Sequence, residues 1–235
     1  MAGKRSYADA CGIARALDVV GERWALLVVR ELLLGPKRFT DLRIGLPHIG
    51  PDVLAQRLRE LERAGILRRR KLPPPAASQI YELTPRGREL EPVLLALGRW
   101  GSRAPFPATY GELSTDAFAV ALKTTFDPAA AGDLSGDFVL RVGEDRLRAQ
   151  VAEGTLEVDR KELLPHGDRR QPAGAEATIS AAPGTLAALL WHGRELDEAV
   201  ESGAVAIAGD GSLIQRFLSS FPLSGERAPV DAAVT

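Results

Sequence analysis

The chain has 235 residues, 45% hydrophobic and 26% charged, a globular composition long enough for two small domains. Its single cysteine, Cys11, excludes an internal disulfide and with it the class of disulfide-rich secreted proteins. The first ten residues lack the apolar segment of a signal peptide, and no apolar run approaches the roughly 18 residues of a transmembrane helix. We therefore expect a cytoplasmic protein with no membrane partner.

The two halves of the chain differ in charge. Residues 1–103 carry 19 basic and 11 acidic side chains, a net charge of +8, whereas residues 104–235 carry 11 and 20. A basic half is typical of binding to polyanions such as DNA. Two prolines, Pro105 and Pro107, lie where the sign changes and favour a short, stiff linker. We predict a basic domain over 1–103, a linker over 104–111, an acidic domain over 112–224 and a flexible tail over 225–235.

Apolar periodicity predicts three helices in the basic half. The first covers residues 22–34 and ends at a Gly-Pro pair, and a short second helix begins near residue 38 and ends before Pro47. The third begins at Pro51, because proline suits the first helical position, and ends before Gly65.

A hairpin and a last helix complete this half. Residues 66–72 and 79–83 form short extended segments on either side of a proline-rich turn. Thr84 and Pro85 are an N-cap followed by a first-turn proline, and the helix that they start runs through Trp100. This order of elements is that of a winged helix-turn-helix, so we expect a mainly α domain with a β wing.

The third helix has the two faces that a DNA-reading helix needs. Leu54, Leu58 and Leu61 form a core-facing stripe, and hydrogen-bonding side chains point the other way. Gln56 suits adenine, and Arg59 suits guanine or a phosphate, while Asp52 can accept from cytosine. The cationic hairpin and the preceding short helix, with Lys37, supply phosphate contacts. The predicted DNA-binding residues are Arg38, Thr40, Arg43, Pro51, Asp52, Gln56, Arg59, Arg63, Arg68, Arg69, Arg70 and Lys71. For Arg57, which flanks the stripe, an internal ion pair and a DNA contact both stay open.

Several motifs also occur in the order of a known family: CGIARALDVVGERW from Cys11, LLLGPKRF from Leu32, LAQRLRELE from Leu54, and YELTPRG from Tyr81. They resemble the HxlR-type branch of the winged-helix bacterial transcription regulators, over about residues 8–102. The resemblance implies a homodimer on a pseudo-palindromic operator in double-stranded DNA. It also implies that Cys11 is placed as a redox- or electrophile-sensing thiol, although a buried structural thiol is the alternative. The resemblance leads us to expect a serine or a similar N-cap at position 50, and this sequence departs from it with Gly50.

The acidic half predicts an α+β layer. A helix over 115–126 precedes three antiparallel strands, and a charged loop over 160–174 separates them from the remaining elements. The final helix is capped by Asp210 and includes Phe217 and Phe221. The other expected elements are strands at 137–142, 146–151, 155–159, 175–180 and 204–208, and helices from Pro183 and over 195–201.

The segment LAALLWHGRELDEAVESG, followed by a strand, Gly-Asp and a helix, resembles the sterol carrier protein-like fold, over about residues 112–222. This resemblance implies a hydrophobic cavity that admits a lipid or another apolar small molecule as effector. The alternative for each candidate lining residue is a place in the hydrophobic core of the domain, without contact to a ligand. The candidates are Phe118, Phe126, Leu140, Leu189, Trp191, Phe217 and Phe221.

Catalytic and metal-binding motifs are missing from the sequence. There is no nucleophile elbow, zinc-protease, phosphate-loop or dinucleotide motif, and the three histidines lack the spacing of metal ligands. We expect no enzyme activity, no metal and no cofactor. The sequence therefore predicts a dimeric transcription regulator modulated by an apolar molecule. The alternatives are a lipid carrier whose winged helix contacts protein, and a sensor that acts through Cys11.

Overall fold

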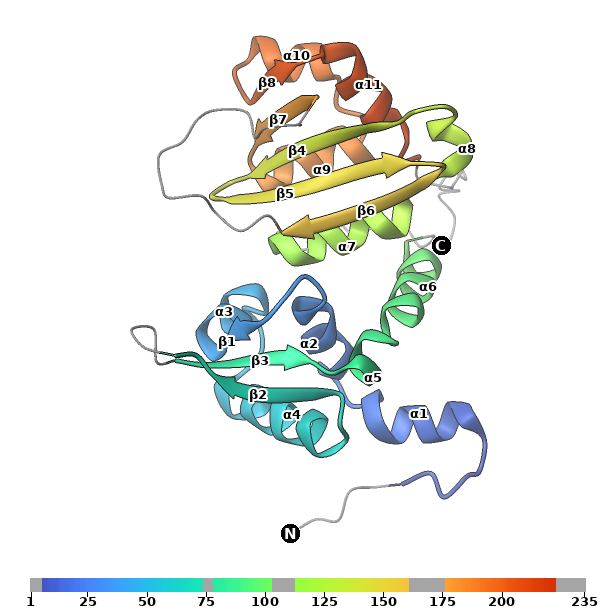
Figure 1. The fold of residues 1–235 in the computed structure, drawn as a ribbon, viewed down its shortest axis with the longest axis vertical. Coiled ribbons are helices and arrows are strands. Elements are labelled where there is room, and N and C mark those ends of the chain that lie inside the picture. Colours follow the sequence, from blue (N-terminus) through green and yellow to red (C-terminus); the bar gives the residue numbers. More distant parts are fainter. Residues whose placement is uncertain (1–5, 74–77, 103–112, 161–175, 223–235) are drawn as a thin grey trace, which may run out of the picture. The chain divides into compact units, whose positions relative to one another are not determined.

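The computed structural model describes residues 6–73, 78–102, 113–160 and 176–222. Its contacts divide the chain into two compact units (Figure 1). The first unit comprises residues 1–95 and 113–120, and the second comprises residues 96–112 and 121–235. The whole of the predicted linker and the whole of the predicted tail lie outside the described residues, so the predicted domain boundaries stay a prediction.

The first unit contains the predicted helices and hairpin of a winged helix in the predicted order, preceded by helix α1, which was not predicted. Its sheet has the strand order β1-β3-β2 and is antiparallel throughout. Strand β1 pairs with β3 (Figure 1). It has only two residues, too few to show an alternating pattern in the sequence. The elements are α1 (Gly12–Val20), α2 (Ala25–Leu32), β1 (Lys37–Arg38), α3 (Phe39–Gly45), α4 (Pro51–Arg63), β2 (Leu67–Lys71), β3 (Gln79–Leu83) and α5 (Pro85–Arg88). Helix α6 (Glu91–Gly101) begins in this unit, and its residues after Leu95 belong to the second.

One apolar core holds this unit together. Leu54, Leu58 and Leu61 of α4 are at most 1% exposed and pack with residues of α2 and α3. The ends of α4 follow from its sequence, because Pro51 begins the helix and Gly65 adopts a positive φ of 71° just after it. The predicted stripe is therefore confirmed, and it leaves the opposite face of α4 for another purpose.

The single helix predicted from Pro85 to Trp100 is wrong, because the structure breaks it into α5 and α6. Thr84 caps α5 as expected, since its hydroxyl accepts a hydrogen bond of 3.1 Å from the Gly87 amide. The break follows from Pro92, which has no N–H to donate to the carbonyl of Arg88, four residues earlier. The ring of Pro92 would also clash with that carbonyl in a continuous helix.

The second unit is built on a five-stranded mixed sheet with the order β6-β5-β4-β7-β8. Strands β4 and β7 are parallel, and the other neighbours are antiparallel. Helix α7 begins in the first unit and ends in the second, and α11 packs on β7, α8 and α9. The elements are α7 (Thr115–Thr125), α8 (Pro128–Ala131), β4 (Gly136–Val142), β5 (Asp145–Ala152), β6 (Thr155–Arg160), β7 (Ala177–Ala181), α9 (Pro183–Trp191), α10 (Leu196–Glu201), β8 (Val205–Gly209) and α11 (Gly211–Ser219).

Details of this half differ from the prediction. Helix α8 was not expected between the 115–126 helix and the first strand. It forms because the carboxylate of Asp127 accepts from the Ala129 amide and a first-turn proline follows. Phe221 lies beyond the end of α11, where Ser220 is the C-cap. Residues 161–175, which hold nearly all of the expected loop, are outside the described residues. None of the helices in the described ranges is long and apolar enough to cross a membrane.

Four phenylalanine rings pack together in the second unit. The ring centroids of Phe138 and Phe217 are 4.5 Å apart, and Phe221 lies 4.9 Å from Phe217 and 5.8 Å from Phe126. Three of these rings belong to the predicted cavity lining, and here they contact one another. Phe118, also predicted there, is fully buried but belongs to the first unit. The sterol carrier-like cavity stays a prediction.

Candidate DNA-binding interface

The solvent-facing side of α4 presents polar and cationic side chains. Asp52, Gln56, Arg59 and Arg63 are all exposed, opposite the buried leucines. Gln56 donates a hydrogen bond of 2.9 Å from its amide nitrogen to Oε1 of Glu60, which holds the side chain along the helix surface. A rigid, well-anchored helix with such a face has the form that enters a major groove.

The start of α4 lacks the serine N-cap that the resemblance led us to expect. Pro51 is exposed and occupies the first turn, and Gly50 is the N-cap in an extended conformation with no side chain to cap the helix. The free amides of this turn are therefore left for solvent or for an anion such as a phosphate.

Arg57, whose role the sequence leaves open, belongs to an internal ion pair. The residue is 8% exposed, and its Nη1 donates to Oε2 of Glu60. Its Nη2 also lies 3.6 Å from Oε2 of Glu22. Burial and two carboxylate partners direct Arg57 toward the protein, so it is not among the groups that α4 offers to DNA.

The β2–β3 hairpin, which we call the wing, carries a row of exposed cations. Leu67 is buried, and Arg68, Arg69, Arg70 and Lys71 after it are exposed. Four adjacent cations on a projecting hairpin form the electrostatic surface that phosphate binding requires.

Glu82 on β3 neutralises part of this charge. Nε of Arg68 donates to Oε1 of Glu82 at 2.7 Å, and Nε of Arg70 lies 3.3 Å from the same oxygen. Burial by itself would raise the pKa of the Glu82 carboxyl, but the hydrogen bonds from Arg68 and Arg70 outweigh burial and lower it. Arg69 is only loosely engaged, with Nε 3.6 Å from Oε1 of Glu62.

Helix α3 contributes a third set of exposed groups. Arg38, Thr40 and Arg43 are exposed, and Asp41 organises the first turn by accepting from the Arg38 amide at 3.0 Å and from the Thr40 hydroxyl at 3.2 Å. Lys37 was also expected to contact phosphate, and that prediction is wrong. Its Nζ is mostly buried and is bound to two carboxylates inside the unit.

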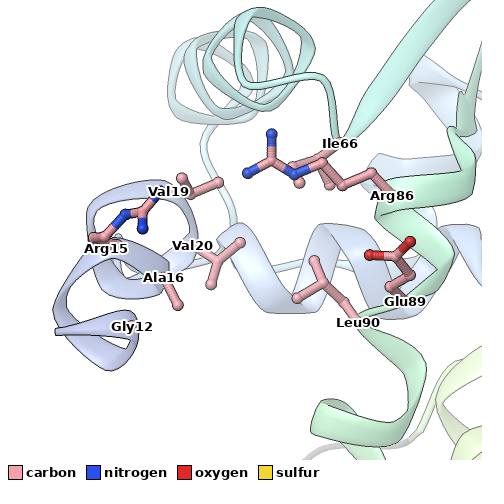
Figure 2. Close-up of a pocket in the computed structure, with 9 residues that line it drawn as sticks. All are labelled: Gly12, Arg15, Ala16, Val19, Val20, Ile66, Arg86, Glu89 and Leu90. Atoms are coloured by element: carbon pink, nitrogen blue, oxygen red, sulfur yellow. The ribbon is translucent and has the colours of Figure 1, made fainter. Parts of the chain in front are cut away.

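A pocket of about 490 Å³ lies beside α1, on a different part of the first unit (Figure 2). Its walls combine apolar and charged side chains, and Figure 2 shows Arg15 across the opening from Arg86 and Glu89. In the described part of the chain, Arg15 and Glu89 make no ion pair. The lining residues are Gly12, Arg15, Ala16, Val19, Val20, Ile66, Arg86, Glu89 and Leu90.

Helices α1 and α6 expose large apolar side chains. Ile13 is 72% exposed and Trp100 is 73% exposed, and Leu17, Val93 and Leu97 are also exposed. Cys11, at the N-cap of α1, is exposed too.

Comparison with known proteins identifies this arrangement. Residues 19–107 match the family described as HxlR-like helix-turn-helix. Over 88 residues the chain is 35% identical to the uncharacterised HTH-type transcriptional regulator YvaP of Bacillus subtilis, a match that covers 37% of this chain and 82% of that protein. The chain belongs to the HxlR-like family. It is also 40% identical over 92 residues to the uncharacterised HTH-type transcriptional regulator sll1512 of Synechocystis, covering 39% of this chain and 68% of that protein.

A solved structure is similar to the HxlR-like part as well. The reduced form of the transcriptional regulator YodB from Bacillus subtilis is 34% identical, with a TM-score of 0.37, covering 40% of this chain and 94% of that one. Membership of the HxlR-like family makes the chain a DNA-binding transcription regulator. Because the family match ends at residue 107, it gives no account of the second unit.

Sequence reasoning missed two groups of charged residues. Glu82 was read only as part of a strand, although the hairpin register places it opposite Arg68. Glu31 lies in the helix expected over 22–34, where an acidic residue on an apolar face signals a buried partner. Across the described ranges, no three His, Cys, Asp or Glu residues are grouped to hold a metal ion.

Proposed function

We propose that this regulator binds a pseudo-palindromic operator as a homodimer, with α4 in the major groove and the wing on the adjoining phosphates. The observation that carries the proposal is the pairing of an exposed polar face on α4 with an exposed cationic row on β2. Two such modules related by twofold symmetry read half-sites about 34 Å apart, one turn of DNA.

The exposed residues divide into two roles. Gln56 and Arg59 read base edges, adenine and guanine respectively, and Asp52 accepts from cytosine. Phosphate contacts position the module and carry no sequence information of their own. They come from Arg38, Thr40, Arg43, Arg63, Arg68, Arg69, Arg70 and Lys71. Pro51, which has no N–H to donate, contacts the DNA backbone only by packing at the start of α4.

Helices α1 and α6 supply the dimer contacts in this proposal. Exposed apolar side chains on both helices favour burial against a second copy. In an isologous interface the same surface of both copies is used, so each contact between two different residues occurs twice, with the two copies exchanged. Arg15 and Glu89, charged residues of opposite sign on the same pocket, suit such an exchange. The occupant of the pocket is then the second copy.

The second unit supplies regulation. An apolar small molecule bound there changes operator affinity only if it binds the free and DNA-bound states unequally. The aromatic cluster of Phe126, Phe217 and Phe221 marks the place where such a molecule would have to displace packed rings. The second candidate sensor is Cys11, because its thiol is exposed at the first turn of a proposed dimer helix.

The test is selection of DNA fragments by the full-length protein, followed by titration of the selected fragment at several salt concentrations. We expect enrichment of an inverted repeat, and an affinity that falls steeply and linearly on a log–log plot against salt. Binding without enrichment and without salt dependence would overturn the proposal and favour the carrier whose winged helix contacts protein.

A further inference from the structure

Glu31 is a charged residue inside the apolar core of the first unit. It is 0% exposed and belongs to α2, whose neighbouring residues Val28, Val29 and Leu32 are also buried. A buried carboxylate is costly unless hydrogen bonds and opposite charges compensate it. The surroundings of Glu31 must therefore contain those partners.

Three side chains surround the Glu31 carboxylate. Nη2 of Arg30 donates to Oε1 at 2.9 Å, and Nζ of Lys37 donates to Oε2 at 2.8 Å. The hydroxyl of Ser114 donates to Oε1 at 2.7 Å. Lys37 in turn donates to Oδ2 of Asp116 at 2.5 Å, and Asp116 is itself 2% exposed. Together these five residues form what we call the Glu31 cluster.

The Glu31 cluster is electrically balanced and tightly enclosed. Two cations, Arg30 and Lys37, face two carboxylates, Glu31 and Asp116. A Cβ at Gly45, the last residue of α3, would lie 2.1 Å from Oε2 of Glu31. The cluster therefore lies directly against α3 and has no space for a side chain at that position.

Two members of the cluster come from outside the matched family region. Ser114 and Asp116 lie at the start of α7, beyond residue 107, yet belong to the first unit. The hydroxyl of Ser114 also accepts from the Ala117 amide at 3.0 Å. That bond fixes the oxygen at the start of α7 and leaves its proton for Glu31.

The cluster is connected to the candidate DNA-binding surface through β1. Lys37 pairs with Tyr81 of β3 in the wing sheet, and the next residue, Arg38, is the N-cap of α3. The backbone of Lys37 thus joins the wing to α3, while its ammonium group is held by Glu31 and Asp116.

We propose that Ser114 and Asp116 are positioning residues for DNA binding, which fix β1 and the start of α3 through Lys37 and Glu31. This inference rests on the proposed binding mode, in which α3 and the wing contact phosphates. Loss of the Asp116 charge leaves a buried excess of positive charge and frees Lys37 from one of its two partners.

Helix α7 continues beyond the Glu31 cluster into the second unit. The helix is continuous from Thr115 to Thr125, and its residues after Val120 belong to the second unit. There, Nε1 of Trp191 donates to the Thr125 hydroxyl at 3.1 Å.

The experiment compares full-length wild type with Asp116→Asn and Ser114→Ala on the operator fragment selected by wild type. Asp133→Asn is the matched control, because Asp133 is exposed and pairs only at the surface, with Arg216. We expect Asp116→Asn to weaken DNA affinity on the order of tenfold, in the range of coupled residues, and the control to change nothing. Asp116→Glu, which keeps the charge, should recover part of the loss.

Hydrogen exchange separates positioning from general destabilisation. In Asp116→Asn, exchange should rise for the amides of residues 38–43 and stay unchanged for α4. In a double-mutant cycle with Lys37→Met, the two losses of affinity should be less than additive. Wild-type affinity and exchange in Asp116→Asn would overturn this inference. Failure of wild type to bind any DNA would instead overturn the proposed function.

Discussion

Glu82 and Arg68 face each other across the wing, with Nε of Arg68 2.7 Å from Oε1 of Glu82 in the register that pairs the two residues. Arg70, two residues further along β2, reaches the same carboxylate. One acidic residue therefore holds two of the four wing cations. Glu82 orders the wing and at the same time reduces the positive charge that the wing offers to DNA.

Replacing Glu82 by Gln should tighten DNA binding. The substitution removes one negative charge beside Arg68 and Arg70 and leaves both guanidinium groups available to phosphates. Each additional phosphate neutralised steepens the dependence of log K on log salt by about 0.9. Titration at four or more salt concentrations measures both the affinity and this slope. Glu144→Gln is the control, because Glu144 is exposed in the turn before β5 and its loss changes net charge equally. An unchanged slope in Glu82→Gln would show that the wing does not contact phosphate.

The same residue makes stability depend on pH. Because Arg68 and Arg70 hold the pKa of Glu82 below its ordinary value of 4.5 in the folded chain, ionised Glu82 stabilises the fold above that value. The contribution is lost as pH falls below 4.5 through the lowered folded pKa. The free energy of unfolding of wild type should therefore exceed that of Glu82→Gln near neutral pH, and the gap should close in acid. Urea titrations between pH 3 and pH 7 measure the difference, and a gap that stays constant would contradict the ion-pair account. The range from about pH 3 to pH 7 is chosen because it spans the titration of an ordinary carboxyl group.

Arg59 and Arg69 should have different effects on DNA recognition. Arg59 lies on the exposed face of α4 and is proposed to read a base, so Arg59→Ala should cost about 1–3 kcal/mol and relax preference at one operator position. Arg69 lies on the wing, so Arg69→Ala should weaken all sequences alike and lower the salt slope by about one. Binding to a panel of single-base operator variants separates the two effects. If Arg59→Ala kept the wild-type preference, α4 would not be reading the base assigned to Arg59.

The parts of the fold that sequence predicts well are those with local causes. The leucine stripe of α4 and its ends at Pro51 and Gly65 depend on residues within one helix, and the structure confirms them. The break between α5 and α6 was also present in the sequence, because Pro92 forbids a continuous helix. That error came from following apolar periodicity through a proline.

Other features could not be predicted because their causes are distant in sequence. Lys37 looked like a phosphate contact, since a lysine beside Arg38 ordinarily faces solvent. The partner that withdraws it from the surface, Asp116, lies 79 residues away, in a segment with no motif in common with the winged helix. For Arg57 the cause is partly distant. Its hydrogen-bonded partner Glu60 lies one helical turn away, but its second partner, Glu22, lies in the turn before α2.

A charge exchange tests the proposed dimer. If Arg15 of one copy meets Glu89 of the other, Arg15→Glu places two carboxylates together at both symmetry-related contacts, and Glu89→Arg places two cations together. Each single variant should weaken the dimer and therefore the operator affinity, whereas the double variant restores opposite charges and should recover both. Sedimentation equilibrium measures association, and DNA titration measures its consequence. Arg88→Glu provides a control, because Arg88 is exposed on α5 but does not line the pocket. Two impaired single variants that the double variant fails to rescue would show that Arg15 and Glu89 do not pair.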